Sequence, residues 1–447
     1  MAFSVGKAAS FPAPISDRRR LTGGRPSREA RGRPAARSDA PAEASSFATT
    51  WSSFWRSRLL IWAAGLIAVG VLGTASGAVH AFDPTGISHS FGTVGNLLTA
   101  PAVRWDSIWY LQIAHGGYRT LQETAFFPLY PLLIRAGSGL TGSLGVSAIL
   151  ISLGALLAGL EIVRRLTVLE LGHSAANATV RLMAFGPWAI FLSAAYTESL
   201  FLALSAGTFY AARRGRWATA GALGGLAAMT RITGVLLIVP IVLLFFYGPR
   251  SDRPPGPAGA WWRPRYRIAP QALWALLIPA GVGLFAAYLA LRGFRPAATL
   301  HADGQFWGRH LVGPLAGIAN GLQAAWHELK LGLSGVAPSV DASPSVLQLG
   351  ALIASLAGLC VVLRRLPIAY GAYVALGLLV PLSTTTSGDP LKDLDRYASI
   401  LFPLFMGAGA WATERRALRA LLLASAVLLA VFCAQFATWH WVGSSSL

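Results

Sequence analysis

One carboxylate, Asp106, stands in an aromatic stretch that follows the first long apolar run of the chain. The stretch reads RWDSIWYLQIAHGGY, from Arg104 to Tyr118. A carboxylate within hydrogen-bond reach of a substrate hydroxyl can take its proton as a general base. The alternative is that Asp106 is the N-cap of a helix, a position that favours aspartate. The residue types alone leave both interpretations open.

We expect the residues after Asp106 to form an amphipathic helix that lies in the membrane interface, with its tryptophans as anchors. Gly116 and Gly117 should end this helix. The following segment FFPLYPLLI, residues 126–134, is too short to span a membrane comfortably, so we expect it to be interfacial or re-entrant. Candidate substrate contacts in and after this stretch are Arg104, Trp105, His115, Tyr118 and Glu123.

Two further ionisable residues, Glu198 and Arg231, interrupt apolar regions in the segments AYTES and TRITG. Ionisable residues at membrane depth are costly and mark functional sites. A guanidinium binds phosphoryl oxygens with paired hydrogen bonds, so Arg231 is a candidate phosphate ligand. The alternative is a structural Glu198–Arg231 ion pair. The segment KDLDRY adds four candidates, although a solvated loop would explain its mixed charges equally well: Lys392, Asp395, Arg396 and Tyr397.

The composition indicates that these candidate residues belong to a membrane protein. Hydrophobic residues make up 54% of the 447 and charged residues 12%, whereas soluble domains carry about 25% charged residues. Several apolar runs approach the ~20 residues that cross a bilayer as a helix. We predict an all-α polytopic transmembrane bundle with about eleven spans and a long first extracytoplasmic loop. The expected spans are 59–82, 144–163, 180–195, 200–212, 217–229, 233–247, 269–291, 346–363, 368–383, 398–412 and 418–437.

The arginines set the expected orientation. They gather in short groups between apolar runs, which is the pattern of cytoplasmic loops under the positive-inside rule. The same clustering argues against nucleic-acid binding as the reason for the net charge of +19. This orientation places every candidate site residue on the outer side. We expect residues 1–58 to be a disordered basic cytoplasmic tail, 59–438 the membrane domain, and 439–447 a short outer tail.

Taken in order, RWDSIWYLQIAHGGY, FFPLYPLLI, AAYTESLF, TRITG and DRYASILFPLF resemble the PIG-V mannosyltransferases over residues from about 59 to 404. The resemblance implies a GT-C glycosyltransferase, here from a bacterial cytoplasmic membrane, whose active site faces the periplasm. It implies that Asp106 is the catalytic acid of the first outer loop. It also implies a polyprenyl-phosphate sugar donor, mannose as the sugar, and a glycan, lipid or protein acceptor. No cofactor or metal is expected.

The residues themselves fit such a reaction. Asp106 would deprotonate the acceptor hydroxyl, while Arg231, Arg396 or Lys392 would stabilise the charge on the departing phosphate. The two cysteines, Cys360 and Cys433, lie far apart in apolar runs and suggest neither a disulfide nor a metal site. Two rivals stay open: a transporter or flippase of a lipid-linked saccharide, for which the TRITG break could form a midplane site, and a structural subunit without activity.

Overall fold

The computed structural model describes residues 40–438 apart from 75–82, 84, 90–91, 257–262, 296, 335–344 and 387–388. Helices make up most of this part, with 3₁₀ turns at Ile87–His89, Gln122–Ala125, Ile232–Leu237 (η3) and Pro270–Leu276 (η4). Its sheet is a two-residue ladder between β1 (His310–Leu311) and β2 (Thr384–Thr385). The α-helices are α1 Ala40–Leu72, α3 Gly92–Thr99, α4 Ser107–Gly116, α5 Leu129–Thr141, α6 Leu144–Ala184, α7 Glu198–Arg213, α8 Trp217–Ala228, α9 Ile238–Tyr247, α10 Leu277–Leu291, α11 Ala298–Trp307, α12 Pro314–Leu333, α13 Ser345–Arg365, α14 Ile368–Ser383, α15 Leu394–Ile400, α16 Phe402–Glu414 and α17 Leu418–Ala437.

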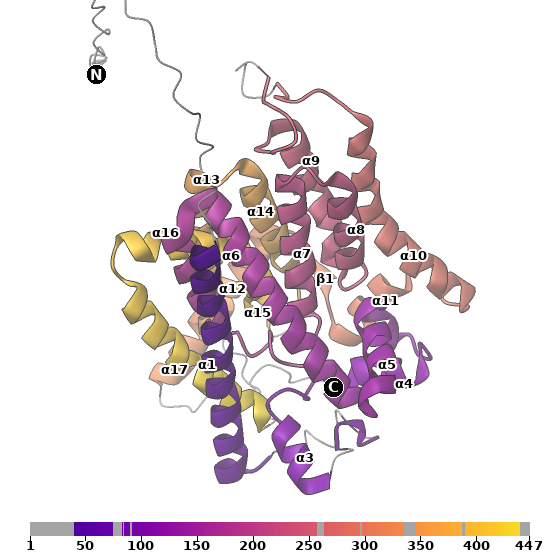
Figure 1. The fold of residues 1–447 in the computed structure, drawn as a ribbon. Helices are drawn as coiled ribbons and strands as arrows, with labels where there is room; N and C mark the ends of the chain where they lie inside the picture. Colours follow the sequence, from indigo (N-terminus) through magenta and orange to yellow (C-terminus); the bar gives the residue numbers. More distant parts are fainter. Residues whose placement is uncertain are drawn as a thin grey trace, which may run out of the picture.

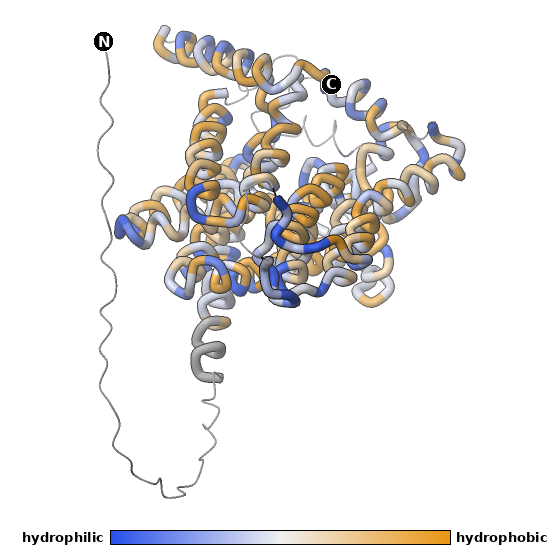
Figure 2. The backbone as a smooth tube through the Cα atoms, turned by 90° about the horizontal axis from the view of Figure 1, so that it is seen from above, coloured by the Kyte–Doolittle hydropathy of each residue, from blue (hydrophilic) through white to orange (hydrophobic). Residues whose placement is uncertain are grey.

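Five helical segments in the described part are long and apolar enough to cross a membrane: Phe47–Leu72, Leu144–Ala184, Pro270–Leu291, Ser345–Arg365 and Leu418–Ala437. Several long helices run side by side in Figure 1, and apolar residues dominate most helices in Figure 2. The chain is therefore an integral membrane helical bundle, as the sequence predicts. The count of eleven spans is not confirmed, because α7, α8, α9, α14 and α16 have only 10 to 16 residues each.

The first helix begins earlier than expected. α1 starts at Ala40 and ends at Leu72, so the boundary predicted at Arg58 falls inside a helix. Phe54 and Arg58 are buried, and Arg58 donates to the Ser193 hydroxyl at 2.6 Å and to the Ala184 carbonyl at 3.0 Å. Residues 47–58 are thus part of the bundle, although they lie in the range expected to be a disordered tail. Residues 1–39 and 439–447 lie outside the described part.

The span predicted over residues 180–195 is wrong. α6 continues to Ala184 through a kink at Gly172, whose φ of 83° lies in the left-handed region. The chain then turns without a regular helix until α7 starts at Glu198. Residues 189–199 of this turn are buried in the protein, which is the condition under which irregular backbone is tolerated at membrane depth. This buried turn delivers Tyr196 and Glu198 to the interior.

The helix after Asp106 is not the interfacial helix that we expected. In α4, six of the ten residues are buried, among them Ile108, Leu111 and Ile113. Trp109 stacks on Phe126 at 5.7 Å between ring centroids, so it packs against protein. The apolar positions of α4 therefore serve the core. Gly116 and Gly117 end the helix as predicted, with φ of 71° at Gly117.

The TRITG break separates α8 from α9, as the sequence predicts, and its last three residues begin η3. Small residues let α8 approach its neighbour closely: a Cβ on Gly221 would lie 2.1 Å from the Trp274 carbonyl oxygen, and a Cβ on Gly225 2.6 Å from that of Leu277. Close backbone contact of this kind is typical of helix pairs in membranes. It fixes the end of α8, three residues before Arg231.

The segment 292–345, which the predicted spans 269–291 and 346–363 place on the outer side, contains two helices, α11 and α12. α11 lies against the region after α4: the Thr299 hydroxyl donates to the Thr124 carbonyl at 2.9 Å, and Trp307 packs edge-on against Trp109 at 6.1 Å. The ladder pairs His310 with Thr385. The segment is therefore tied to the bundle on both sides.

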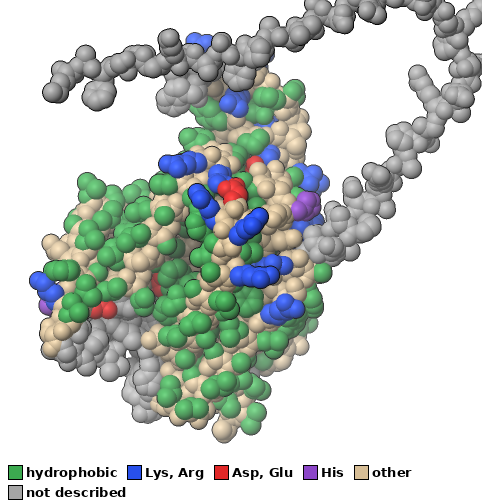
Figure 3. All heavy atoms as spheres, turned by 90° about the vertical axis from the view of Figure 1, so that its left-hand side faces the viewer, with side chains coloured by type: hydrophobic (Ala, Val, Ile, Leu, Met, Phe, Trp, Pro, Cys, Tyr) green, Lys and Arg blue, Asp and Glu red, His purple; other side chains and the backbone are tan. Residues whose placement is uncertain are grey.

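The two ends of α7 differ: its last residue is the basic Arg213, and its first residue, Glu198, belongs to the candidate site. Arg213, its last residue, pairs with Glu170, which also accepts from the Tyr370 hydroxyl at 2.7 Å. Glu198, the first residue of α7, lies about 22 Å away at 1.5 Å per residue. On the face drawn in Figure 3, most basic side chains gather in the upper part and the lower part is largely hydrophobic.

Candidate active site

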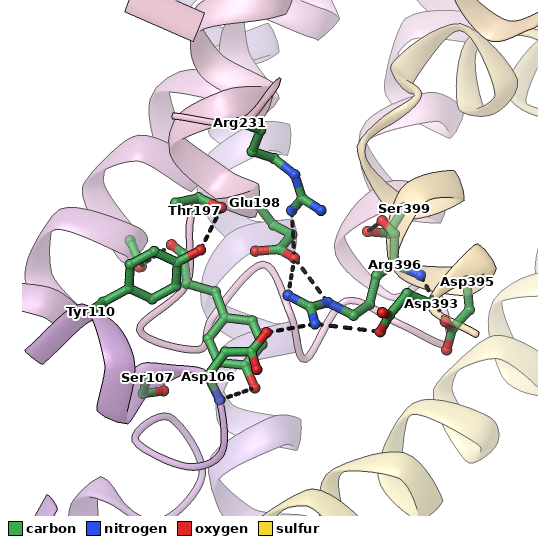
Figure 4. A network of polar contacts seen from close by, with 12 residues as sticks. Asp106, Ser107, Tyr110, Thr197, Glu198, Arg231, Asp393, Asp395, Arg396 and Ser399 are labelled. Carbon is green, nitrogen blue, oxygen red and sulfur yellow. Dashed lines mark hydrogen bonds and ion pairs between the residues drawn. The ribbon is translucent and has the colours of Figure 1, made fainter. Parts of the chain in front are cut away.

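Four segments that are distant in sequence bring charged side chains together in the interior. They are the start of α4, the start of α7, the TRITG break and α15, which supply Asp106, Glu198, Arg231 and Arg396 (Figure 4). All four residues are among the candidates predicted from the sequence. Their contacts could not be read from the sequence, because they join residues up to 290 positions apart.

Asp106 uses its carboxylate for an ion pair and not for helix capping. It occupies the N-cap position of α4, but its side chain makes no capping hydrogen bond. Its Oδ2 lies 2.8 Å from a terminal nitrogen of Arg396, and its backbone N–H donates to the Tyr196 hydroxyl at 3.2 Å. The side chain is 27% exposed. The preceding Trp105 has φ of 53°, a strained conformation for a bulky residue and one that often marks functional sites.

Glu198 is the buried centre of the cluster, with a side chain that is 0% exposed. Its Oε1 accepts from Arg396 at 2.8 and 3.0 Å and lies 2.7 Å from Arg231. The predicted Glu198–Arg231 pair thus exists, but Arg396 shares the carboxylate. The Arg231 guanidinium also lies over the Tyr397 ring at 5.2 Å, a favourable cation–π contact.

Two residues of the cluster were missing from the predicted site. Asp393, at the N-cap of α15 with φ of 65°, lies 2.5 Å from Arg309 and 3.4 Å from Arg396. Burial would raise the pKa of Asp393, but the charges of Arg396, Arg309 and Lys392 lower it to about 2. Lys392 contributes through this charge. The signal for Arg309 was only its position two residues after Trp307, in the segment between two predicted spans.

Two other acids lie beside the cluster and are less strongly compensated. Burial and the charge of Asp393 raise the pKa of Asp395 to about 6. Its carboxylate accepts from the Arg396 backbone N–H at 2.9 Å, and its own N–H donates to Gln348 at 3.4 Å. Burial likewise raises the pKa of Asp303, against the lowering effect of Arg309. The two hydrogen bonds of Asp395 stabilise the first turn of α15.

The remaining candidates from the first motif have protein partners of their own. Arg104 is buried and donates to the carbonyls of Val103 at 2.9 Å and Ala437 at 3.3 Å. The Tyr118 hydroxyl donates to the Phe126 carbonyl at 2.7 Å. Glu123 accepts from the Arg119 and Thr120 N–H groups at 2.5 and 2.8 Å.

Arg104, Tyr118 and Glu123 are thus hydrogen-bonded within the protein. His115 is exposed at the far end of α4, nine residues from Asp106, or about 13 Å along the helix. Trp105 is half-buried against the main hydrophobic core. The structure therefore does not bring Arg104, His115, Tyr118 or Glu123 into the cluster.

The arrangement can support proton transfer and anion binding. A partly exposed carboxylate lies beside guanidinium groups that can bind phosphoryl oxygens. Within the described ranges, no group of three or more histidine, cysteine or acidic side chains could hold a metal ion. The acids of the cluster are paired with arginines instead.

The fold and the site define an integral membrane protein with a buried arginine–carboxylate centre. Residues 79–245 match the family model described as mannosyltransferase (PIG-V). The resemblance expected from the motifs is therefore confirmed over this region, which contains Asp106, Glu198 and Arg231. Arg309, Asp393 and Arg396 lie beyond it.

The relatives that match cover part of the chain. The GPI alpha-1,6-mannosyltransferase 2 of Rattus norvegicus is 31% identical over 172 residues, which are 35% of this chain and 35% of the relative. The GPI mannosyltransferase 2 of Yarrowia lipolytica is 34% identical over 152 residues, 33% of this chain and 41% of the relative. The chain thus spans between a third and two-fifths of the length of these two relatives.

Among solved structures, the oligosaccharyltransferase of Archaeoglobus fulgidus aligns with 87% of this chain and 54% of its own, at 14% identity and a TM-score of 0.39. A second structure of the archaeal enzyme, in complex with an inhibitory peptide and a dolichol-phosphate, gives a TM-score of 0.35.

Proposed function

We propose that this protein is a membrane glycosyltransferase that moves mannose from a polyprenyl-phosphate donor to an acceptor hydroxyl, with inversion at the anomeric carbon. The observation that carries the proposal is the Asp106–Arg396–Glu198–Arg231 cluster, which puts a candidate base beside two candidate phosphate ligands. The match of residues 79–245 to the mannosyltransferase family supports the choice of sugar.

In this reaction the acceptor oxygen forms a bond to the anomeric carbon while the bond from that carbon to the phosphate oxygen breaks. The hydroxyl proton passes to the Asp106 carboxylate, and the bonding pair leaves with the polyprenyl phosphate. Arg231 and Arg396 stabilise the charge that grows on the leaving phosphate, where fixed charges act most strongly. Glu198 holds both guanidiniums in place and keeps the free site close to neutral.

The proposed location is the cytoplasmic membrane of a bacterium, with the site facing the periplasm. The support is the separation along α7 of the basic end, at Arg213, from the site end, at Glu198, because basic residues mark cytoplasmic ends. The donor phosphate would then lie at the outer surface of the membrane and the prenyl chain in the bilayer. The proposed acceptor is a glycan, lipid or protein hydroxyl that is reached from the water side.

The test is to incubate the purified protein with radiolabelled polyprenyl-phosphate mannose and a membrane extract as the source of acceptors. We expect label to appear in a product other than the donor, and free polyprenyl phosphate to appear in equal amount. In vesicles, movement of intact donor between leaflets without transfer would instead establish the transporter alternative.

A further inference from the structure

Asp393 joins two arginines with its two carboxylate oxygens. Oδ2 lies 2.5 Å from a terminal nitrogen of Arg309, and Oδ1 lies 3.4 Å from a terminal nitrogen of Arg396. A phosphodiester also presents two free oxygens that share one negative charge, and it binds guanidinium groups in the same way. The carboxylate of Asp393 thus occupies a position that a donor phosphodiester could take without changing the charge balance.

We propose that Arg309 and Arg396 together form the binding site for the donor phosphodiester, and that Asp393 occupies this phosphodiester site until the donor displaces it. The proposal rests on the proposed function and assigns it a further binding residue, Arg309. Arg396 then has two tasks, because the nitrogen that contacts Asp393 also contacts Asp106 at 2.8 Å. Binding of the phosphate to this nitrogen would weaken its hold on Asp106 and free the base.

Asp393 is held in a way that permits its displacement. Its side chain makes no capping bond to α15 and is 24% exposed. Since the surrounding arginines lower the pKa of Asp393 to about 2, its carboxylate is charged at any working pH and competes with the donor throughout.

Arg309 reaches the cluster from outside the spans. It follows α11, whose Trp307 packs against Phe126 at 5.6 Å, and it precedes β1, which pairs with the segment leading to Asp393. The α11–β1 segment therefore runs from the neighbourhood of α4 to α15, the two elements that carry Asp106 and Arg396. The Arg309 side chain is only 14% exposed, so its charge is directed inward.

The experiment measures binding of radiolabelled polyprenyl-phosphate mannose to the purified full chain in detergent, without acceptor. We expect Arg309→Met to weaken binding by about tenfold or more, the effect of losing a charged hydrogen-bond donor. We expect Asp393→Asn to strengthen binding several-fold, because the competing charge is removed and asparagine tolerates positive φ. The matched control is Arg295→Met, an exposed arginine of the same outer segment, which should bind as the wild type does.

The outcomes separate the proposals. Weaker binding by Asp393→Asn would show that Asp393 supports the site and does not compete with the donor for it. Wild-type binding by Arg309→Met would show that Arg309 is not part of the phosphodiester site. If Arg309→Met does not stay folded, Arg309→Lys replaces it, and an unchanged affinity in that variant would count against the paired hydrogen bonds. A wild-type protein that binds no polyprenyl-phosphate mannose would overturn the proposed donor itself.

Discussion

At the scale of single residues, Arg396 organises the centre by contacting Asp106, Glu198 and Asp393. The three carboxylates come from three elements. Asp106, the proposed base, precedes α4, the buried Glu198 begins α7, and Asp393, the proposed occupant of the phosphate site, precedes α15. A guanidinium with five donors in a rigid fork can serve several acceptors at once. A lysine at this position would supply the charge without the fork.

Glu198 and Arg231 should differ in their effect on stability. Glu198→Gln leaves two guanidiniums without their buried carboxylate, and breaking a buried pair costs roughly 3–5 kcal/mol. Arg231→Gln leaves Glu198 paired with Arg396 and should cost clearly less. Thermal unfolding in detergent can compare the two variants. A larger loss for Arg231→Gln would mean that Arg396 does not compensate Glu198.

Asp395 should make stability depend on pH. Its pKa is raised from 3.8 to about 6, so the folded state holds the proton more tightly than the unfolded state. Stability is therefore highest below about pH 4 with respect to this group and falls as pH rises through 6, by about 3 kcal/mol at 1.36 kcal/mol per unit. Asp395→Asn should remove this fall and be the more stable protein at pH 7. Parallel pH profiles of the two proteins between pH 4 and 7 would contradict the assignment.

The sequence predicted the residues of the centre better than it predicted their partners. Asp106, Glu198 and Arg231 could be selected because each places charge among apolar or aromatic residues, and Arg396 because it belongs to the charged segment KDLDRY. The role of Arg309 depends on the pairing of His310 with Thr385, which no local pattern indicates.

The sequence also did not indicate that Arg104, Tyr118 and Glu123 lie outside the cluster. Most of their partners are backbone groups, and these do not show in a sequence.

At the scale of elements, apolar runs predicted several helices closely and failed at the breaks. The span 368–383 coincides with α14, whereas the run 180–195 divides between the end of α6 and a buried turn. Hydropathy reports burial, and it does not distinguish a helix from irregular backbone buried in protein. The burial of α4 was missed similarly, because Trp109, which packs on Phe126 and Trp307, looks like an interface anchor in the sequence.

Close approach of α8 to the segment that leads into α10 should be necessary for the position of Arg231. Gly221→Ala would put a Cβ 2.1 Å from the Trp274 carbonyl oxygen and force α8 away. We expect lower thermal stability and lower transfer activity. Gly154→Ala in α6 is the matched control, because no atom lies within 4 Å of the added Cβ, and alanine should be neutral or stabilising by up to about 1 kcal/mol. Equal behaviour of the two variants would show that the α8 contact is unimportant.

At the scale of the whole molecule, the basic end and the site end should face opposite sides of the membrane. Single cysteines at the exposed positions Thr120 and Gln323, in a protein lacking Cys360 and Cys433, should react with a membrane-impermeant thiol reagent in intact cells. A cysteine at the exposed Ser251, in the loop that follows α9, should react only after the membrane is opened. Labelling of Ser251 together with Thr120 in intact cells would disprove the two-sided arrangement.

The most direct test of the account is mannose transfer by Asp106→Asn beside the wild-type protein. The substitution keeps the size of the side chain and removes the base, so we predict a fall in the rate of transfer of about 100-fold or more. Binding of polyprenyl-phosphate mannose and the thermal unfolding midpoint should be retained, because Glu198 still holds Arg396. Transfer by Asp106→Asn within a few-fold of the wild-type rate would contradict the assignment of Asp106 as the base.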